Sequence, residues 1–146
     1  MNLSERLNED MKQAMKSKDK FKLSNIRMVR STIKNLEIDL KRSLDDSEVL
    51  DIIGREIKQR KDALQEFEKA GREDLAADAK AEIEFLGAYL PEQLSEEEIK
   101  VIVQQTIQET GASSKADMGK VMSALMPKVK GRADGKLVNQ VVQQFL

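Results

Sequence analysis

Apolar residues recur every three or four positions along almost the whole chain, and this spacing limits the fold more than any other feature. In residues 20–44 the apolar residues with this spacing are Ile26, Val29, Ile33, Leu36 and Leu40. Residues spaced in this way share one face of an α-helix. The 146 residues include only seven Gly and two Pro, which are too few for the turns of an all-β protein. We therefore predict an all-α fold.

Start and stop signals divide this pattern into helices. We expect a first helix from about residue 4 to about residue 17, with Ser4 as its N-cap. A second helix should follow from about residue 20 to about residue 44. Asp45 and Glu48 have the spacing of a capping box and should open a third helix, which Gly71 is expected to stop. The apolar face of the first helix is expected to hold Leu7, Met11, Ala14 and Met15.

Pro91 is expected to end a fourth helix, because the residue before a proline avoids helical geometry. Ser95 and Glu98 form a second capping-box pair and should start a fifth helix that reaches about Thr110. Two shorter helices should follow, one closed by Pro127 and Gly131 and the other started by Asp134. We predict a long-helix N-terminal domain over residues 1–92 and a small three-helix tail domain over residues 95–146.

The composition excludes several kinds of chemistry. The chain has no Cys and no His, so thiolate metal sites and Ser-His or Cys-His nucleophile pairs cannot form. No spacing of acids and lysines singles out a catalytic pair, and we expect no cofactor and no metal site. The longest apolar run, residues 85–90, is too short to cross a membrane. Because the first residues lack the features of a signal peptide, we expect a cytoplasmic location.

Charge is distributed unevenly although the formal net charge is only −1. Residues 11–42 hold ten Lys and Arg against three acids, and residues 111–146 hold six against two. The intervening residues 45–98 hold seven basic residues against seventeen acids. Two basic segments therefore flank an acidic one, a pattern that points to a polyanionic partner.

The basic residues within these segments are themselves patterned. Arg27, Arg30 and Lys34 fall on one side of the second helix, with Lys20 and Lys41, where they could follow a phosphate backbone or form a solvated face. In the tail, four cations lie within nine residues at a helix junction, where the start of the last helix favours an anion. They are Lys128, Lys130, Arg132 and Lys136. The alternative to an anion site is an ordinary turn between two helices, whose cations only increase the solubility of the protein.

Two further patterns bear on the choice of partner. No aromatic residue lies between Tyr89 and Phe145, so the tail would contact phosphates rather than stack on bases. Met118, Met122 and Met126 form a stripe that could belong to the core or to an adaptable groove for a protein partner.

Three stretches of sequence resemble the bacterial YqeY family. They are residues 30–37, residues 89–95, and residues 118–122 together with 131–139. That family is similar to the C-terminal region of GatB, a subunit of the glutamine-dependent aspartyl/glutamyl-tRNA amidotransferase. The resemblance implies an all-helical, two-part module whose tail contacts tRNA. The matching tail positions are Gly119, Lys120, Leu125, Met126, Lys128, Gly131, Ala133, Val138 and Asn139, whereas Asp134-Gly135 departs from the GatB pattern.

These observations lead to one principal hypothesis and two alternatives. The principal hypothesis is a non-catalytic module that binds tRNA or a tRNA-processing or aminoacylation enzyme. Its secondary phosphate contacts would come from Arg27, Arg30 and Lys34. Its main phosphate contacts would come from the tail, through Lys120, Lys128, Lys130, Arg132 and Lys136. One alternative is a protein–protein adaptor that uses apolar helix faces, and the other is part of a carbon–nitrogen ligase with glutamine as amido-N-donor.

Overall fold

The computed structural model describes residues 1–146 and confirms the all-α fold, with seven α-helices, one short 3-10 turn and no strand. No helix has both the length and the apolar character needed to cross a membrane. The elements, in chain order, are α1 (Leu3–Lys16), α2 (Lys20–Leu40), α3 (Asp46–Lys69), α4 (Glu73–Gly87), α5 (Glu96–Thr110), η1 (Lys115–Asp117), α6 (Met118–Val129) and α7 (Gly135–Phe145).

Side-chain caps set most of the helix starts. The expected capping boxes are present at Asp45 with Glu48, where α3 begins, and at Ser95 with Glu98, where α5 begins. The expectation for Ser4 is wrong, because the N-cap of α1 is Asn2. Its side-chain oxygen accepts from the backbone N–H of Glu5 at 2.8 Å, and the Glu5 carboxylate accepts from the backbone N–H of Asn2 at 3.2 Å.

Three helix ends differ from the expected ones. The fourth helix is expected to continue to Pro91, but α4 ends at Gly87, and the backbone N–H of Leu90 donates to the carbonyl of Gly87 in a turn. The second helix stops at Leu40, because Lys41 adopts the left-handed conformation with a φ of 56°.

Pro127 does not end α6, which continues to Val129, and Gly131, the other expected stop, follows with a φ of 74°. Proline lacks a backbone donor and its ring crowds the carbonyl four residues earlier, and here that carbonyl belongs to the exposed Ser123, near the end of the helix. The expected end of α5 is confirmed, since Gly111 supplies the left-handed C-cap with a φ of 69°.

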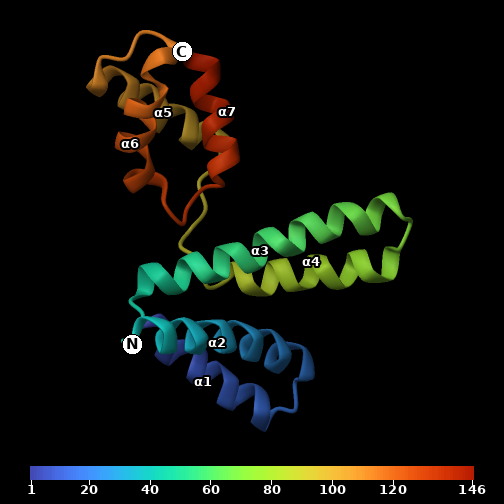
Figure 1. Ribbon diagram of the computed structural model, residues 1–146. Helices are drawn as coiled ribbons and strands as arrows, with labels where there is room; N and C mark the ends of the chain where they lie inside the picture. The colour runs from blue at the N-terminus through green and yellow to red at the C-terminus, as the bar shows by residue number, and fades with distance from the viewer. The chain divides into compact units, whose positions relative to one another are not determined.

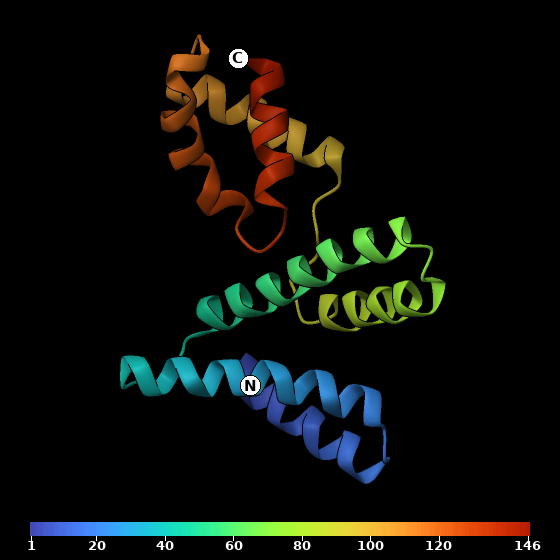
Figure 2. The ribbon, with the colours of Figure 1, turned by 45° about the vertical axis from the view of Figure 1, so that its right-hand side comes forward.

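The chain divides into an N-terminal unit, Met1–Leu90, and a C-terminal unit, Pro91–Leu146. The N-terminal unit consists of two helical hairpins, and both views of the ribbon show α1 beside α2 and α3 beside α4 (Figures 1 and 2). Its core joins both hairpins through fully buried side chains such as Leu7, Val29, Ile53 and Leu86. Burying an aliphatic side chain of this size contributes about 1.5–3 kcal/mol.

The two hairpins of the N-terminal unit have opposite charge. Residues 1–42, which contain α1 and α2, hold eleven Lys and Arg against six acids. Residues 43–90, which contain α3 and α4, hold seven against thirteen. The basic segment found in the sequence is therefore one hairpin of this unit, and most of the acidic segment is the other.

A buried arginine links three helices of the N-terminal unit. Arg60 on α3 is only 8% exposed. Its guanidinium donates to the carboxylates of Glu56 at 2.7 Å and of Glu82 on α4 at 2.8 Å. It also lies 3.1 Å from the sulfur of Met28 on α2. Every donor that Arg60 buries is thus matched by an acceptor, as a buried charge requires.

The C-terminal unit packs α5, α6 and α7 around its own aliphatic core. The segment before α5 is held to the turn between α6 and α7 by two hydrogen bonds. The backbone N–H of Leu94 donates to the carbonyl of Arg132 at 2.8 Å, and Gln93 Nε2 donates to the carbonyl of Gly131 at 2.8 Å. The fully buried core residues are Ile99, Val103, Val121, Leu125, Val138 and Val142.

Candidate functional site

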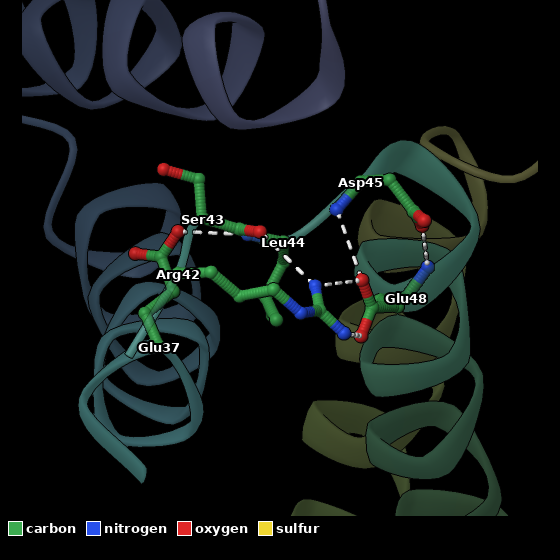
Figure 3. A network of polar contacts seen from close by, with 6 residues as sticks. All are labelled: Glu37, Arg42, Ser43, Leu44, Asp45 and Glu48. Carbon is green, nitrogen blue, oxygen red and sulfur yellow. Dashed lines mark hydrogen bonds and ion pairs between the residues drawn. The ribbon is translucent and has the colours of Figure 1, made fainter. Parts of the chain in front are cut away.

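The polar network at the junction of α2 and α3 fixes one end of the basic hairpin (Figure 3). Arg42 pairs with both carboxylate oxygens of Glu48, at 2.7 and 2.9 Å. The hydrogen bond from Arg42, followed by the backbone N–H of Asp45, lowers the pKa of Glu48 to about 2. Glu37 accepts from the backbone N–H of Leu44 at 3.0 Å. Arg42 and Glu37 are therefore both engaged in holding this junction.

An open groove of about 620 Å³ runs between α1 and α2, and we call it the α1–α2 groove. Its floor is apolar, one wall carries three cations, and Ser4 and Glu37 lie at one end. The residues that line it are Ser4, Leu7, Met11 and Met15 of α1, and Arg27, Arg30, Ser31, Ile33, Lys34 and Glu37 of α2.

The three cations of the α1–α2 groove have no acidic partner. Arg27 and Lys34 are exposed, and neither forms an ion pair or a side-chain hydrogen bond. Nη1 of Arg30 lies 2.8 Å from the sulfur of Met11 and pairs with no carboxylate. The structure thus brings the three secondary site residues of the sequence hypothesis together along one wall. Lys20 and Lys41 do not line the groove.

The tail cation Lys128 is engaged within its own unit. Its ammonium donates to Glu109 Oε2 at 2.7 Å and to Thr106 Oγ1 at 3.0 Å, both on α5. Thr106 is fully buried, and Glu109 is largely exposed. Lys128 therefore ties α6 to α5, and much of its charge is balanced there.

Three other tail cations belong to the turn between α6 and α7. Lys130 and Lys136 are exposed, whereas Arg132 is half-buried and its Nε donates to the carbonyl of Glu92 at 3.4 Å. The pKa of Glu98 is lowered mainly by hydrogen bonds from Ser95, with a smaller contribution from the charge of Arg132. We call Lys130, Arg132 and Lys136 the α6–α7 turn cations.

Lys120 lies apart from the α6–α7 turn cations. It is exposed in the first turn of α6, ten residues before Lys130. At 1.5 Å per residue, this separates their backbones by about 15 Å along the helix. A ligand that reaches both Lys120 and the α6–α7 turn must therefore extend along the whole of α6.

The methionine stripe of α6 is divided between core and surface. Met118 and Met122 pack against the core of the C-terminal unit, whereas Met126 is 40% exposed. The stripe does not form a continuous partner groove. The adaptable methionines of this chain that do line a groove are Met11 and Met15. The sequence placed both on the apolar face of the first helix, but it gave no signal that this face would stay partly open.

The whole chain matches one family model. Residues 4–146 match the model described as Yqey-like protein, which covers both units and all of the cations described above. The chain belongs to the YqeY family. The resemblance seen in the sequence motifs is therefore confirmed, and the relation to the GatB tail is consistent with this membership.

Similar proteins occur in fungi. The chain is 33% identical over 144 residues to altered inheritance of mitochondria protein 41 of Pyrenophora tritici-repentis, an alignment that covers 97% of the chain and 79% of that protein. It is 45% identical over 84 residues to the protein of the same name from Kluyveromyces lactis, covering 57% of the chain and 45% of that protein. The chain thus spans less than half the length of the Kluyveromyces relative.

The names of these relatives correct one expectation from the sequence. Both proteins, and a third from Vanderwaltozyma polyspora, are named as mitochondrial. The expectation of a cytoplasmic location is therefore wrong. It rested on the lack of a secretory signal peptide, and that feature does not distinguish cytoplasm from mitochondrion.

Proposed function

We propose that this YqeY-family chain is a non-catalytic module that binds tRNA or a tRNA-processing or aminoacylation enzyme. The proposal is supported by the tail motif, which resembles the tRNA-contacting tail of GatB and lies within the family match. The observation that carries it is the placement of three cations, Lys130, Arg132 and Lys136, at the single turn between α6 and α7.

The turn has the chemistry that a phosphate backbone requires. It precedes the N-terminus of α7, where backbone N–H groups carry a partial positive charge that favours an anion, although the Asp134 carboxylate already accepts from one of them, that of Lys136, at 3.0 Å. Lys136 lies in the first turn of α7 and adds a full charge at the same end. Binding of this kind reads phosphates and shape, in keeping with the absence of aromatic residues between Tyr89 and Phe145.

The proposed contacts differ in how they are engaged in the free chain. Lys128 pairs with Glu109, whose side chain is 63% exposed, so a phosphate must compete with that carboxylate for its ammonium. In the proposal, Lys128 therefore contributes less to RNA binding than the α6–α7 turn cations. Lys120 contacts a separate phosphate near the start of α6, about 15 Å from the turn.

The test is a titration of the full chain with labelled tRNA at several salt concentrations. Each phosphate that is neutralised contributes about 0.7–0.9 to the slope of log affinity against log salt. We expect the double variant Lys130→Glu/Lys136→Glu to weaken binding and to flatten the slope by about 1.5. Glutamate in the first turn of a helix favours the helix, so the change at position 136 should not unfold α7.

A matched control separates this site from a general charge effect. Lys58→Glu/Lys61→Glu reverses two exposed cations of α3 and changes the net charge equally. We expect it to leave the slope unchanged. Failure of the wild-type chain to bind tRNA at low salt would refute the proposal. An equal loss of affinity in both double variants would also refute it, since binding would then depend on net charge alone.

A further inference from the structure

The α1–α2 groove combines an apolar floor with a cationic wall, and a phosphate backbone would contact only the wall. The accessible part of its floor comes from the half-buried Met11 and from Met15, which is 52% exposed, because Leu7 and Ile33 beneath them are already buried in the core. An apolar floor gains free energy only when an apolar group covers it, at about 25 cal/mol per Å². Nucleic acid phosphates and sugars offer little such surface. The floor therefore favours a ligand with an apolar stripe.

The cationic wall specifies the charge of that ligand. Arg27, Arg30 and Lys34 recur at intervals of three and four residues and extend over about 10 Å of α2. None of them forms an ion pair with a carboxylate of the chain, and Glu37, at the end of the groove, accepts a hydrogen bond from the backbone N–H of Leu44. Carboxylates that recur at intervals of three and four residues along a second helix would have the same repeat. The charge complementarity therefore points to an acidic ligand.

We propose that the α1–α2 groove docks an acidic amphipathic helix of a partner protein. The groove is lined from Ser4 to Met15 on α1 and from Arg27 to Glu37 on α2, a length of about 15 Å, which corresponds to about three helical turns. Leucines or isoleucines of the partner contact the floor, and its acids face Arg27, Arg30 and Lys34. This mode of recognition places an amphipathic helix between two others.

A second copy of this chain does not supply such a helix. Its acidic hairpin, α3 with α4, already buries its own apolar stripe, including Val49, Ile53 and Leu86, in the core of the N-terminal unit. The acidic first turn of α5 belongs to a helix whose apolar residues Ile99 and Val103 are likewise buried. The partner is therefore a different protein. This inference does not depend on the proposed tRNA contacts, which use the C-terminal unit.

The methionines make a direct test possible. The full chain, labelled with ¹³C at the methionine methyl groups, is titrated with a synthetic helical peptide of about four turns that carries a leucine stripe flanked by glutamates. We expect the methyl signals of Met11 and Met15 to shift, whereas those of Met118 and Met122, in the core of the C-terminal unit, stay unchanged.

Two variants and two altered peptides separate the contributions of charge and floor. Arg27→Glu/Lys34→Glu should weaken binding about tenfold, because two attractive contacts become repulsive. Lys12→Glu/Lys61→Glu, which changes the charge equally at exposed positions outside the groove, should change affinity less than about twofold. Met15→Gln should weaken binding several-fold. A peptide with glutamine for every glutamate, and one with serine for every leucine, should each bind poorly.

Three outcomes would overturn the inference. The first is the absence of methyl shifts at Met11 and Met15 with the acidic amphipathic peptide. The second is equal weakening by Arg27→Glu/Lys34→Glu and by the control variant. The third is that a short RNA binds the groove more tightly than the peptide and is insensitive to Met15→Gln, which would make it an RNA site. Because Lys130→Glu/Lys136→Glu leaves the groove intact, failure here and failure of the tRNA proposal can be distinguished.

Discussion

Removing the buried charge of Arg60 should destabilise the N-terminal unit more than any surface change. In Arg60→Met, an aliphatic side chain keeps most of the packing volume, but Glu56, whose side chain is 13% exposed, loses its ion-pair partner. Breaking one side of a buried pair costs about 3–5 kcal/mol. Glu82 is 34% exposed and can regain water, so we expect the lower end of this range, about 3 kcal/mol.

The expected loss is large enough to measure by thermal unfolding. A change of 1 kcal/mol shifts the Tm of a domain of this size by about 4–8 °C, so Arg60→Met should lower the Tm by about 12–24 °C. Tyr89 is the single tyrosine of a chain without tryptophan, and it is buried in the N-terminal unit. Its near-ultraviolet circular dichroism therefore reports unfolding of this unit separately.

The control for this prediction is an exposed ion pair of the same hairpin. Lys80→Met breaks a pair with Glu68 whose atoms lie 3.8 Å apart and whose side chains are mostly exposed, so it should cost less than about 0.5 kcal/mol. Glu56→Gln combined with Arg60→Met should recover part of the loss, because the uncompensated carboxylate is removed. If Arg60→Met alone stays within about 1 kcal/mol of the wild type, the buried-pair reasoning is refuted.

Two further changes test the helix ends. The pKa of Glu48 is lowered to about 2 in the folded chain, so its contribution to stability is present above about pH 4.5 and is lost as the pH falls towards 2. The variant Glu48→Gln should therefore flatten the dependence of the urea midpoint on pH over this range. An unchanged profile would contradict this role of Glu48. Gly111→Ala places a side chain at a φ of 69° and should cost the C-terminal unit about 1–2 kcal/mol by urea unfolding, whereas Gly119→Ala within α6 should cost nothing or stabilise it.

Local signals in the sequence predicted the helices well where a single side chain decides the boundary. The boxes at Asp45 and Ser95 depend on residues three positions apart, so tertiary structure is not needed to recognise them. The errors arose where two local options competed. Asn2 displaced Ser4 as the first cap, and α6 tolerated Pro127 because the freed carbonyl of Ser123 is exposed.

Charge patterns were less informative about the candidate site, because pairing depends on distant residues. The sequence showed Lys128 as one of four neighbouring cations, but its partner Glu109 lies nineteen positions away on another helix. Arg60 is a polar residue within an apolar stripe, and its burial depends on Glu82 of the next helix. The α1–α2 groove was likewise missed, since an apolar periodicity does not reveal how completely two helices cover each other.

The opposite charges of the two hairpins in the N-terminal unit give that unit a permanent electric dipole. A polyanion or an acidic helix that approaches this unit exerts a torque on it before any contact forms. As a result, α1 and α2 turn towards the anionic ligand, and α3 and α4 turn away from it. Such orientation raises the association rate at low ionic strength, and added salt screens it over about 10 Å. The arrangement of charge thus determines which face of the unit an anionic ligand contacts first, and it does so independently of the final affinity.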